Sequence, residues 1–171
     1  MSMSNFVFGD DIIDSREVVS RLEELQGDRD DLNDSLDVAN EEYDKVKRYD
    51  QDMGEDDPDP GGLIEECYDE VESIKDSIAD LEKDELEPLE AFCSVGEGYS
   101  EWSSGVSLIH EDHFVEYTKQ LIDDAYEMPV ELDQGGWPWD HISIDYDAAA
   151  EALKQDYGTI EFEEETYYLQ A

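Results

Sequence analysis

Apolar residues recur at alternating steps of four and three along the first part of the chain. The series runs Val18, Leu22, Leu25, Arg29, Leu32, Leu36, Ala39, Tyr43 and Val46, and only Arg29 interrupts it. This spacing lines one stripe of a helix and is the heptad repeat of a coiled coil. Asp14-Ser15-Arg16-Glu17 offers a capping box just before the series begins. The pattern predicts a long helix that starts near residue 15.

A second heptad series follows a break in the pattern. Residues 50–62 have no apolar periodicity and contain two Pro and three Gly, which predicts a loop. The second series then runs Ile64, Cys67, Val71, Ile74, Ile78 and Leu81, and its helix is expected to continue through Leu86 to a break or kink at Pro88. Two such helices joined by a loop predict an antiparallel hairpin. Pairing between chains, as in a homodimer, is the competing arrangement.

The pattern changes to short mixed elements after residue 90. A strand is expected at 105–110, a helix at 112–127, and a second helix that Asp145 caps and Gly158 stops. The segments 159–162 and 166–169 flank a Glu-rich turn and predict a closing β-hairpin. The fold class is therefore predicted to be α+β, with an acidic helical hairpin over residues 1–90 and a small α+β domain over residues 91–171.

Charge narrows the possible partners more than any motif does. The chain has 51 Asp and Glu against 10 Lys and Arg, a formal net charge of −41. Direct binding to nucleic acid or to an anionic membrane needs basic residues that neutralise the partner, so both are excluded, and the partner is expected to be basic. No apolar stretch is long enough to cross a membrane and no signal peptide is present. We therefore expect a cytoplasmic protein.

The heptad register places many acids on the outward positions b, c and f of both helices. With Val18 at position d and Ile64 at position a, these acids are Glu23, Glu24, Asp30, Asp31, Asp34, Asp37, Glu41, Asp44, Glu65, Glu66, Asp69, Glu72, Asp76 and Asp80. The eight acids of the first helix extend over about 32 Å, or about one charge per 4 Å. One strand of B-DNA has one charge per about 3.4 Å. The hairpin is thus expected to have nearly the linear charge density of a nucleic acid strand.

Two less specific explanations of this acidity exist. Acids on the outer face of a coiled coil are often only solvated surface, but such surfaces normally interleave Lys with Glu because like-charged neighbours destabilise a helix. Adaptation to high salt is the other explanation. It favours Arg over Lys, whereas this chain has six Lys and four Arg.

The candidate chemical sites in the sequence lack required residues. Asp50 and Asp52 begin a calcium-loop pattern, but Gly54 stands at the fifth position, where an EF-hand needs an acid. Loose divalent binding by the loop at 50–62 remains open. His110 and His113 have the spacing of a metal pair but no third ligand, and Cys67 and Cys93 form no zinc motif. We therefore expect no catalytic residue, no metal, no cofactor and no enzymatic activity.

The C-terminal third resembles a known family. Trp137-Pro138, Ile144-Asp145-Tyr146, Ala149, Leu153, Asp156-Tyr157 and the hairpin at 160–168 are similar to the C-terminal part of acidic antirestriction proteins of the ArdA type from phages and mobile elements. An Arg common in the family's penultimate helix is absent here, where Glu151, Ala152 and Leu153 stand. The resemblance implies a phage origin and imitation of B-DNA by surface carboxylates.

Together these features lead to one functional hypothesis and one alternative. The hypothesis is a phage-encoded DNA mimic, an anti-defence inhibitor that occupies the basic DNA-binding channel of a host enzyme such as a restriction-modification complex. The outward acids of the two helices would make the contact. The alternative is an acidic scaffolding coiled coil in which the seams pair between chains and the charge only prevents aggregation.

Overall fold

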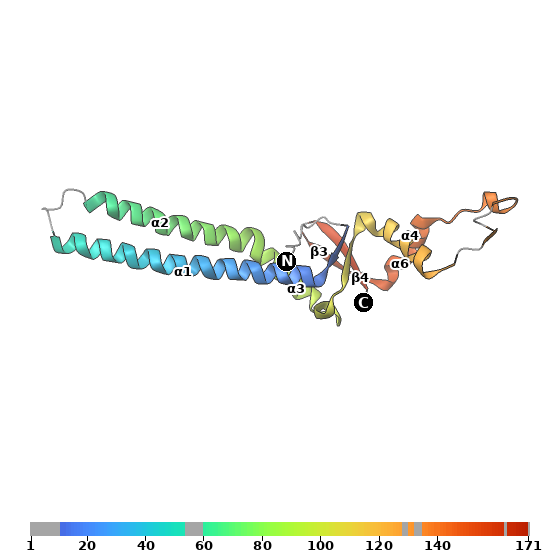
Figure 1. Cartoon of the computed structure of the whole chain (residues 1–171), viewed down its shortest axis with the longest axis horizontal. Coiled ribbons are helices and arrows are strands. Elements are labelled where there is room, and N and C mark those ends of the chain that lie inside the picture. Colours follow the sequence, from blue (N-terminus) through green and yellow to red (C-terminus); the bar gives the residue numbers. More distant parts are fainter. Residues whose placement is uncertain (1–10, 54–59, 128–129, 132–134, 163, 171) are drawn as a thin grey trace. The chain divides into compact units, whose positions relative to one another are not determined.

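The computed structural model describes residues 11–53, 60–127, 130–131, 135–162 and 164–170, and its fold class is α+β, as predicted (Figure 1). The chain divides into two compact units. One unit consists of Ser20–Ala91, and the other combines the residues up to Val19 with Phe92–Ala171. The second boundary lies next to the expected one at residue 90. The first boundary was not expected, because residues 11–19 belong with the C-terminal unit.

The two heptad series form the helices α1 (Ser15–Met53) and α2 (Pro60–Leu81). The predicted loop at 50–62 was too long at both ends. Asp50 and Asp52, from the calcium pattern, belong to the last turn of α1, and Pro60 is the first residue of α2. Proline is tolerated there because the first N–H groups of a helix have no partner within it. Residues 54–59 lie outside the described residues.

The predicted break at Pro88 is replaced by a change of helix type. A π-helical turn, η2 (Glu82–Leu86), follows α2, and α3 (Glu87–Gly96) then begins without a loop. The Glu87 N–H donates to the Glu82 carbonyl oxygen, five residues back. Proline lacks an N–H and its ring crowds the carbonyl four residues earlier, so an α-helix at this point needs a local adjustment. The π-helical turn just before Pro88 supplies it.

A four-stranded antiparallel sheet is the centre of the other unit. Its spatial order is β1-β2-β4-β3, with β1 at Ile12–Asp14, β2 at Ser107–His110, β3 at Tyr157–Phe162 and β4 at Glu165–Gln170. The predicted hairpin of β3 and β4 is confirmed, with Ile160 opposite Tyr167. The expected strand at 105–110 is two residues shorter. Strand β1 was not predicted, and its Ile13 pairs with Leu108.

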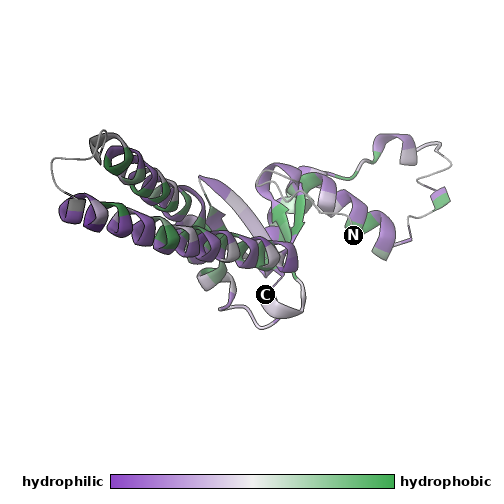
Figure 2. Ribbon diagram, turned by 60° about the vertical axis from the view of Figure 1, so that its left-hand side comes forward, coloured by the Kyte–Doolittle hydropathy of each residue, from purple (hydrophilic) through white to green (hydrophobic). Residues whose placement is uncertain are grey.

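Aromatic side chains pack against both faces of this sheet. On one face the ring of Phe92 lies 5.9 Å from that of Trp102 and 6.2 Å from that of Tyr167. On the other face the fully buried Phe114 lies 4.7 Å from Tyr168 and packs with Ala150. Phe114 is the first residue of α4 (Phe114–Ala125), and Ala150 belongs to α6 (Tyr146–Leu153). In Figure 2 part of the sheet is green, and other strands are pale or purple because polar residues alternate with apolar ones along them.

The ends of the two helices on this face differ in part from expectation. The helix predicted at 112–127 is shorter, because a 3₁₀ turn at Glu111–His113 precedes α4. Asp145 caps α6 as predicted, since its Oδ1 accepts from the Ala148 N–H at 3.0 Å. Gly158 does not stop this helix but lies in β3. A Cβ at that position would be 2.6 Å from the Tyr99 ring, so a close ring contact, rather than a helix end, requires the glycine.

A buried serine fixes the start of α1. Ser15 donates through Oγ to the Trp102 carbonyl at 2.7 Å and accepts from the Val106 N–H at 2.8 Å. Asp14 accepts from the Arg16 N–H at 2.9 Å and caps the helix. The hydrogen bond from the Arg16 side chain also lowers the pKa of Asp14. These bonds explain why residues 11–19 belong to the sheet-containing unit.

We expect Gly96→Ala to destabilise the protein. The added Cβ would lie 2.5 Å from the ring of Trp102, a buried side chain that is only 3% exposed. Overpacking of this kind lowers the free energy of unfolding by about 1–3 kcal/mol. Urea unfolding followed by circular dichroism measures the change.

Gly27→Ala is the matched control. Gly27 lies within α1 with nothing within 4 Å of an added Cβ. Alanine there should raise the free energy of unfolding by about 0.5–1 kcal/mol, because glycine has the higher entropic cost in a helix. If both variants shift stability in the same direction, the close contact between Gly96 and Trp102 does not decide the outcome.

Candidate interaction surface on the helical hairpin

The heptad positions form the interior of the hairpin unit, as the sequence predicts. Leu25, Ala39 and Val71 are buried. The remaining seam residues in this unit are half-buried, including Arg29, whose guanidinium leaves the seam to pair with Asp30 at 3.0 Å. Both views show α1 and α2 side by side, and Figure 2 shows that most of their residues are hydrophilic, in purple. The narrow apolar interface leaves most of each helix surface to the acids.

Specific side chains connect the two helices in antiparallel order. Near one end Arg21 Nη2 lies 3.0 Å from Glu85 Oε2. Farther along α1, the ring of Tyr43 lies 6.1 Å from that of Tyr68 on α2. Later residues of α1 thus meet earlier residues of α2. The hairpin prediction is therefore confirmed, and the seams pair within one chain.

The fourteen candidate acids lie where the heptad register predicts. Glu23, Glu24, Asp30, Asp31, Asp34, Asp37, Glu41 and Asp44 on α1 are all exposed. On α2, Glu65, Glu66, Asp69, Asp76 and Asp80 are exposed, whereas Glu72 is half-buried. Glu72 accepts from Lys75 Nζ at 2.8 Å, and this hydrogen bond raises the pKa of Lys75. The acids thus form one line of carboxylates on α1 and a second line on α2.

Most of these fourteen carboxylates are not neutralised by the chain itself. Ion pairs with Lys or Arg hold Glu24, Asp30, Glu41, Asp44 and Glu72, and within the described residues the other nine have none. Residues 20–91 contain 28 acids and seven bases, a net charge of −21. Between Arg29 and Lys45 there are seven acids and no base, and between Arg48 and Lys75 there are eleven acids and no base. Within the described parts of the hairpin, Asp31, Asp34 and Asp37 have no Lys or Arg at ion-pairing distance. The middle of α1 is therefore a run of exposed, uncompensated charge.

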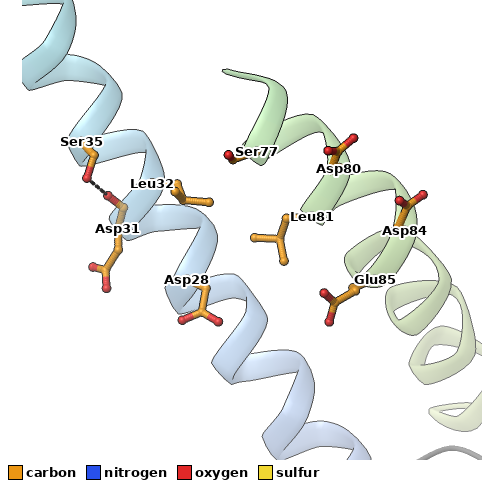
Figure 3. Close-up of a pocket in the computed structure, with 9 residues that line it drawn as sticks. All are labelled: Asp28, Asp31, Leu32, Ser35, Ser77, Asp80, Leu81, Asp84 and Glu85. Atoms are coloured by element: carbon orange, nitrogen blue, oxygen red, sulfur yellow. Dashed lines mark hydrogen bonds between the residues drawn. The ribbon is translucent and has the colours of Figure 1, made fainter. Parts of the chain in front are cut away.

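A groove along one edge of the hairpin contains acids that the sequence analysis did not select. It has a volume of about 670 Å³ and is lined by Asp28, Asp31, Leu32, Ser35, Ser77, Asp80, Leu81, Asp84 and Glu85. Figure 3 shows Leu32 and Leu81 pointing toward each other from the two helices, with Asp28 and Glu85 beside the space between them and Asp31, Asp80 and Asp84 on the outer sides. Asp28, Asp84 and Glu85 were missed because only positions b, c and f were counted. The g positions of Asp28 and Asp84, beside the seam, are the signal that would have found these two. Glu85 stands at position a, where an extension of the second heptad series past Leu81 would have found it.

Polar groups of the sheet-containing unit are engaged in local structure. His110 does not pair with His113: its Nε2 lies 2.6 Å from Glu165 Oε2, and its Nδ1 accepts from the Asp112 N–H at 3.2 Å. The Tyr117 and Tyr157 hydroxyls lie 2.9 Å apart, and burial raises the pKa of Tyr157. Lys154 Nζ lies over the Tyr168 ring and 3.0 Å from Glu151 Oε1. These contacts connect secondary-structure elements and leave the hairpin as the candidate site.

No group of three or more His, Cys, Asp or Glu side chains is arranged to hold a metal ion in the part of the chain that the structure covers. The helices described here include none with the length and apolarity needed to span a membrane. Comparison with known proteins gave no matching family, no curated relative and no similar solved structure.

We expect the melting temperature to rise with sodium chloride concentration. Self-repulsion opposes the folded hairpin, and the Debye length falls from about 10 Å at 0.1 M to about 3 Å at 1 M. Thermal melts at increasing sodium chloride, followed by circular dichroism, measure this. A variant with Asp31, Asp34 and Asp37 changed to Asn should show a shallower rise. A flat profile for the unmodified chain would contradict the repulsion argument.

Proposed function

We propose that the protein is a phage-encoded DNA mimic that inhibits a host DNA-binding defence enzyme by occupying its basic DNA-binding channel. The observation that carries this proposal is the base-free run of exposed carboxylates on α1, opposite a second acidic helix. A channel that binds duplex DNA presents Lys and Arg side chains spaced for phosphates. Carboxylates at about one per 4 Å along a rigid helix offer those side chains charged acceptors at nearly the spacing of phosphates.

The mechanism needs no covalent step. The acidic hairpin is attracted to the same positive potential that steers DNA into the channel, and it then excludes the duplex by occupying its place. We therefore propose an inhibitor without enzymatic activity, metal or cofactor, which acts in the cytoplasm of the infected cell. Because the surface is acidic, we propose no direct contact with nucleic acid or membrane. The resemblance of residues 137–168 to ArdA-type proteins supports a restriction-modification enzyme as the first target to test.

The packing of the seam supports the scaffolding alternative less well than it supports the proposed inhibitor. A coiled coil that assembles between chains needs apolar stripes available to another copy. Here Leu25, Ala39 and Val71 are buried within one chain, and Tyr43 packs against Tyr68 of the same chain. Light scattering over a concentration series separates the two functions, because a scaffold should polymerise as its concentration rises.

The direct test is competition with DNA. Purified protein is titrated into a type I restriction-modification enzyme in the presence of labelled duplex DNA, and DNA binding and cleavage are followed. The proposal expects DNA release and loss of cleavage, with an affinity that falls steeply with salt, as DNA binding does. Simultaneous binding of protein and duplex at one channel would overturn the proposal for that enzyme.

The effect of substitutions should be distributed over many acids. A single Asp34→Asn change removes a small share of the field and should leave inhibition nearly intact. Changing Glu23, Glu24, Asp30, Asp31, Asp34 and Asp37 together to amides should abolish inhibition, while the seam stays unchanged and circular dichroism confirms the fold. Complete loss from Asp34→Asn alone would instead point to an ordinary interface with one dominant residue.

A further inference from the structure

The two edges of the hairpin differ in chemistry. In an antiparallel pair of helices, the g positions of one helix lie across from the g positions of the other, and e positions lie across from e. The g edge carries Asp28, Ser35 and Glu42 on α1 and Glu70, Ser77 and Asp84 on the other side. The e edge carries Gln26, Asn33, Asn40 and Lys47 opposite Tyr68, Lys75 and Glu82. Acids therefore face acids across the g edge only.

Like charges across the g edge are the opposite of the pattern that stabilises an isolated hairpin. The e and g positions of coiled coils normally hold opposite charges that attract across the edge, and like charges there destabilise the pair. The e edge supplies its own cations, since Lys75 pairs with Glu72 and Lys47 Nζ lies 5.4 Å from the Tyr43 ring centre. Among the described residues, Asp28 and Asp84 of the g edge have no ion pair, and neither have Asp31 and Asp80 at the neighbouring c positions.

Two grooves lie beside these acids. The groove of about 670 Å³ lies on the g edge, and a second groove of about 350 Å³ is lined by Asp34, Ser35, Val38, Ala39, Glu42, Glu70 and Ile74. Ser35 lines both grooves. In each groove apolar side chains come from both helices, Leu32 and Leu81 in the first and Val38 and Ile74 in the second. Each groove thus combines apolar side chains with carboxylates.

The chain itself contains an example of the side chain that fits there. Arg21, a g position at the end of this edge, has one guanidinium nitrogen 3.0 Å from Glu85 of the opposite helix and another 3.4 Å from Glu24 of its own. Glu85 also lines the larger groove. Arginine and lysine join an apolar stem to a cationic head, so their stems can pack on the leucines while the heads meet the carboxylates.

We propose that the g edge is the contact face of the hairpin, and that its two grooves receive arginine and lysine side chains from one basic segment of the partner. This inference rests on the proposed function for the identity of that partner, a DNA-binding surface. It adds that the hairpin binds through one edge, with the e edge facing away from the partner.

A steric test leaves the net charge unchanged. The probe is a fluorescently labelled, alanine-based helical peptide with arginines along one face, and its binding to the full chain is measured by anisotropy. Ser35→Trp places a large ring where the two grooves meet and should weaken binding by about tenfold or more. The control Asn40→Trp adds the same ring to an exposed position of the e edge and should change the affinity by less than about twofold. Equal effects would overturn the inference.

A charge test decides the case if the tryptophan disturbs folding. Asp31, Asp80 and Asp84 are changed together to Asn, and the control changes Asp37, Asp69 and Asp76, which line neither groove. Both triple variants lose three negative charges, so a uniform field predicts the same loss of affinity for each. The contact-face inference expects the first triple variant to bind the peptide several-fold more weakly than the second. Indistinguishable affinities would overturn it.

The proposed function and the contact face can fail separately. Suppose that the unmodified protein does not displace DNA from restriction-modification enzymes, but that the groove variants bind the arginine peptide more weakly than their controls do. The proposed function then fails and the contact face stands. If the protein displaces DNA and the paired variants weaken it equally, the proposed function stands and the contact face fails.

Discussion

Like-charge repulsion along the hairpin is the constraint on which the rest of this unit depends. Residues 20–91 have a net charge of −21, and the two helices that carry most of it are paired through a narrow apolar interface in which Leu25, Ala39 and Val71 are buried. Backbone hydrogen bonds of a helix are satisfied within the helix, so a long hairpin needs only a narrow apolar stripe to stay paired. Most of each helix surface is then free for acids. A compact globule of this composition would instead have to crowd the same carboxylates together.

The elements that were predicted well are those with a sustained period. Nine consecutive heptad positions from Val18 to Val46 specify α1 whatever their neighbours are, and alternation in β3 and β4 likewise needs only local sequence. Strand β1 has three residues, too few to show a period, and it exists because Ile13 finds Leu108 far along the chain. The prediction of a break at Pro88 was wrong because the local sequence does not show how the chain accommodates the proline. Proline does disfavour a regular α-helix at this point, but a π-helical turn accommodates it without ending the helix.

The candidate surface shows the same division between local and long-range information. The outward acids follow from the register of each helix alone, so the sequence identifies them. The g-edge acids can be identified as part of one surface only when the two helices pair antiparallel, because that pairing brings Asp28 and Asp84 to one groove. Each helix considered alone places Asp28 between the seam and the solvent. The sequence therefore identifies the charge of the surface, and the pairing of the helices identifies its edge.

A hairpin offers a basic partner more than a single acidic helix does. One helix presents one line of carboxylates, and its mobile counterions are displaced by a partner much as they are from a DNA strand. Two helices present lines on either side of a groove, as a duplex presents two phosphate strands. The groove of the hairpin also contains Leu32 and Leu81, for which phosphates have no equivalent. An arginine that enters it gains burial of its stem in addition to charge pairing. On this proposal, a protein that imitates the charge of DNA can compete with DNA through apolar contacts that DNA backbone does not offer.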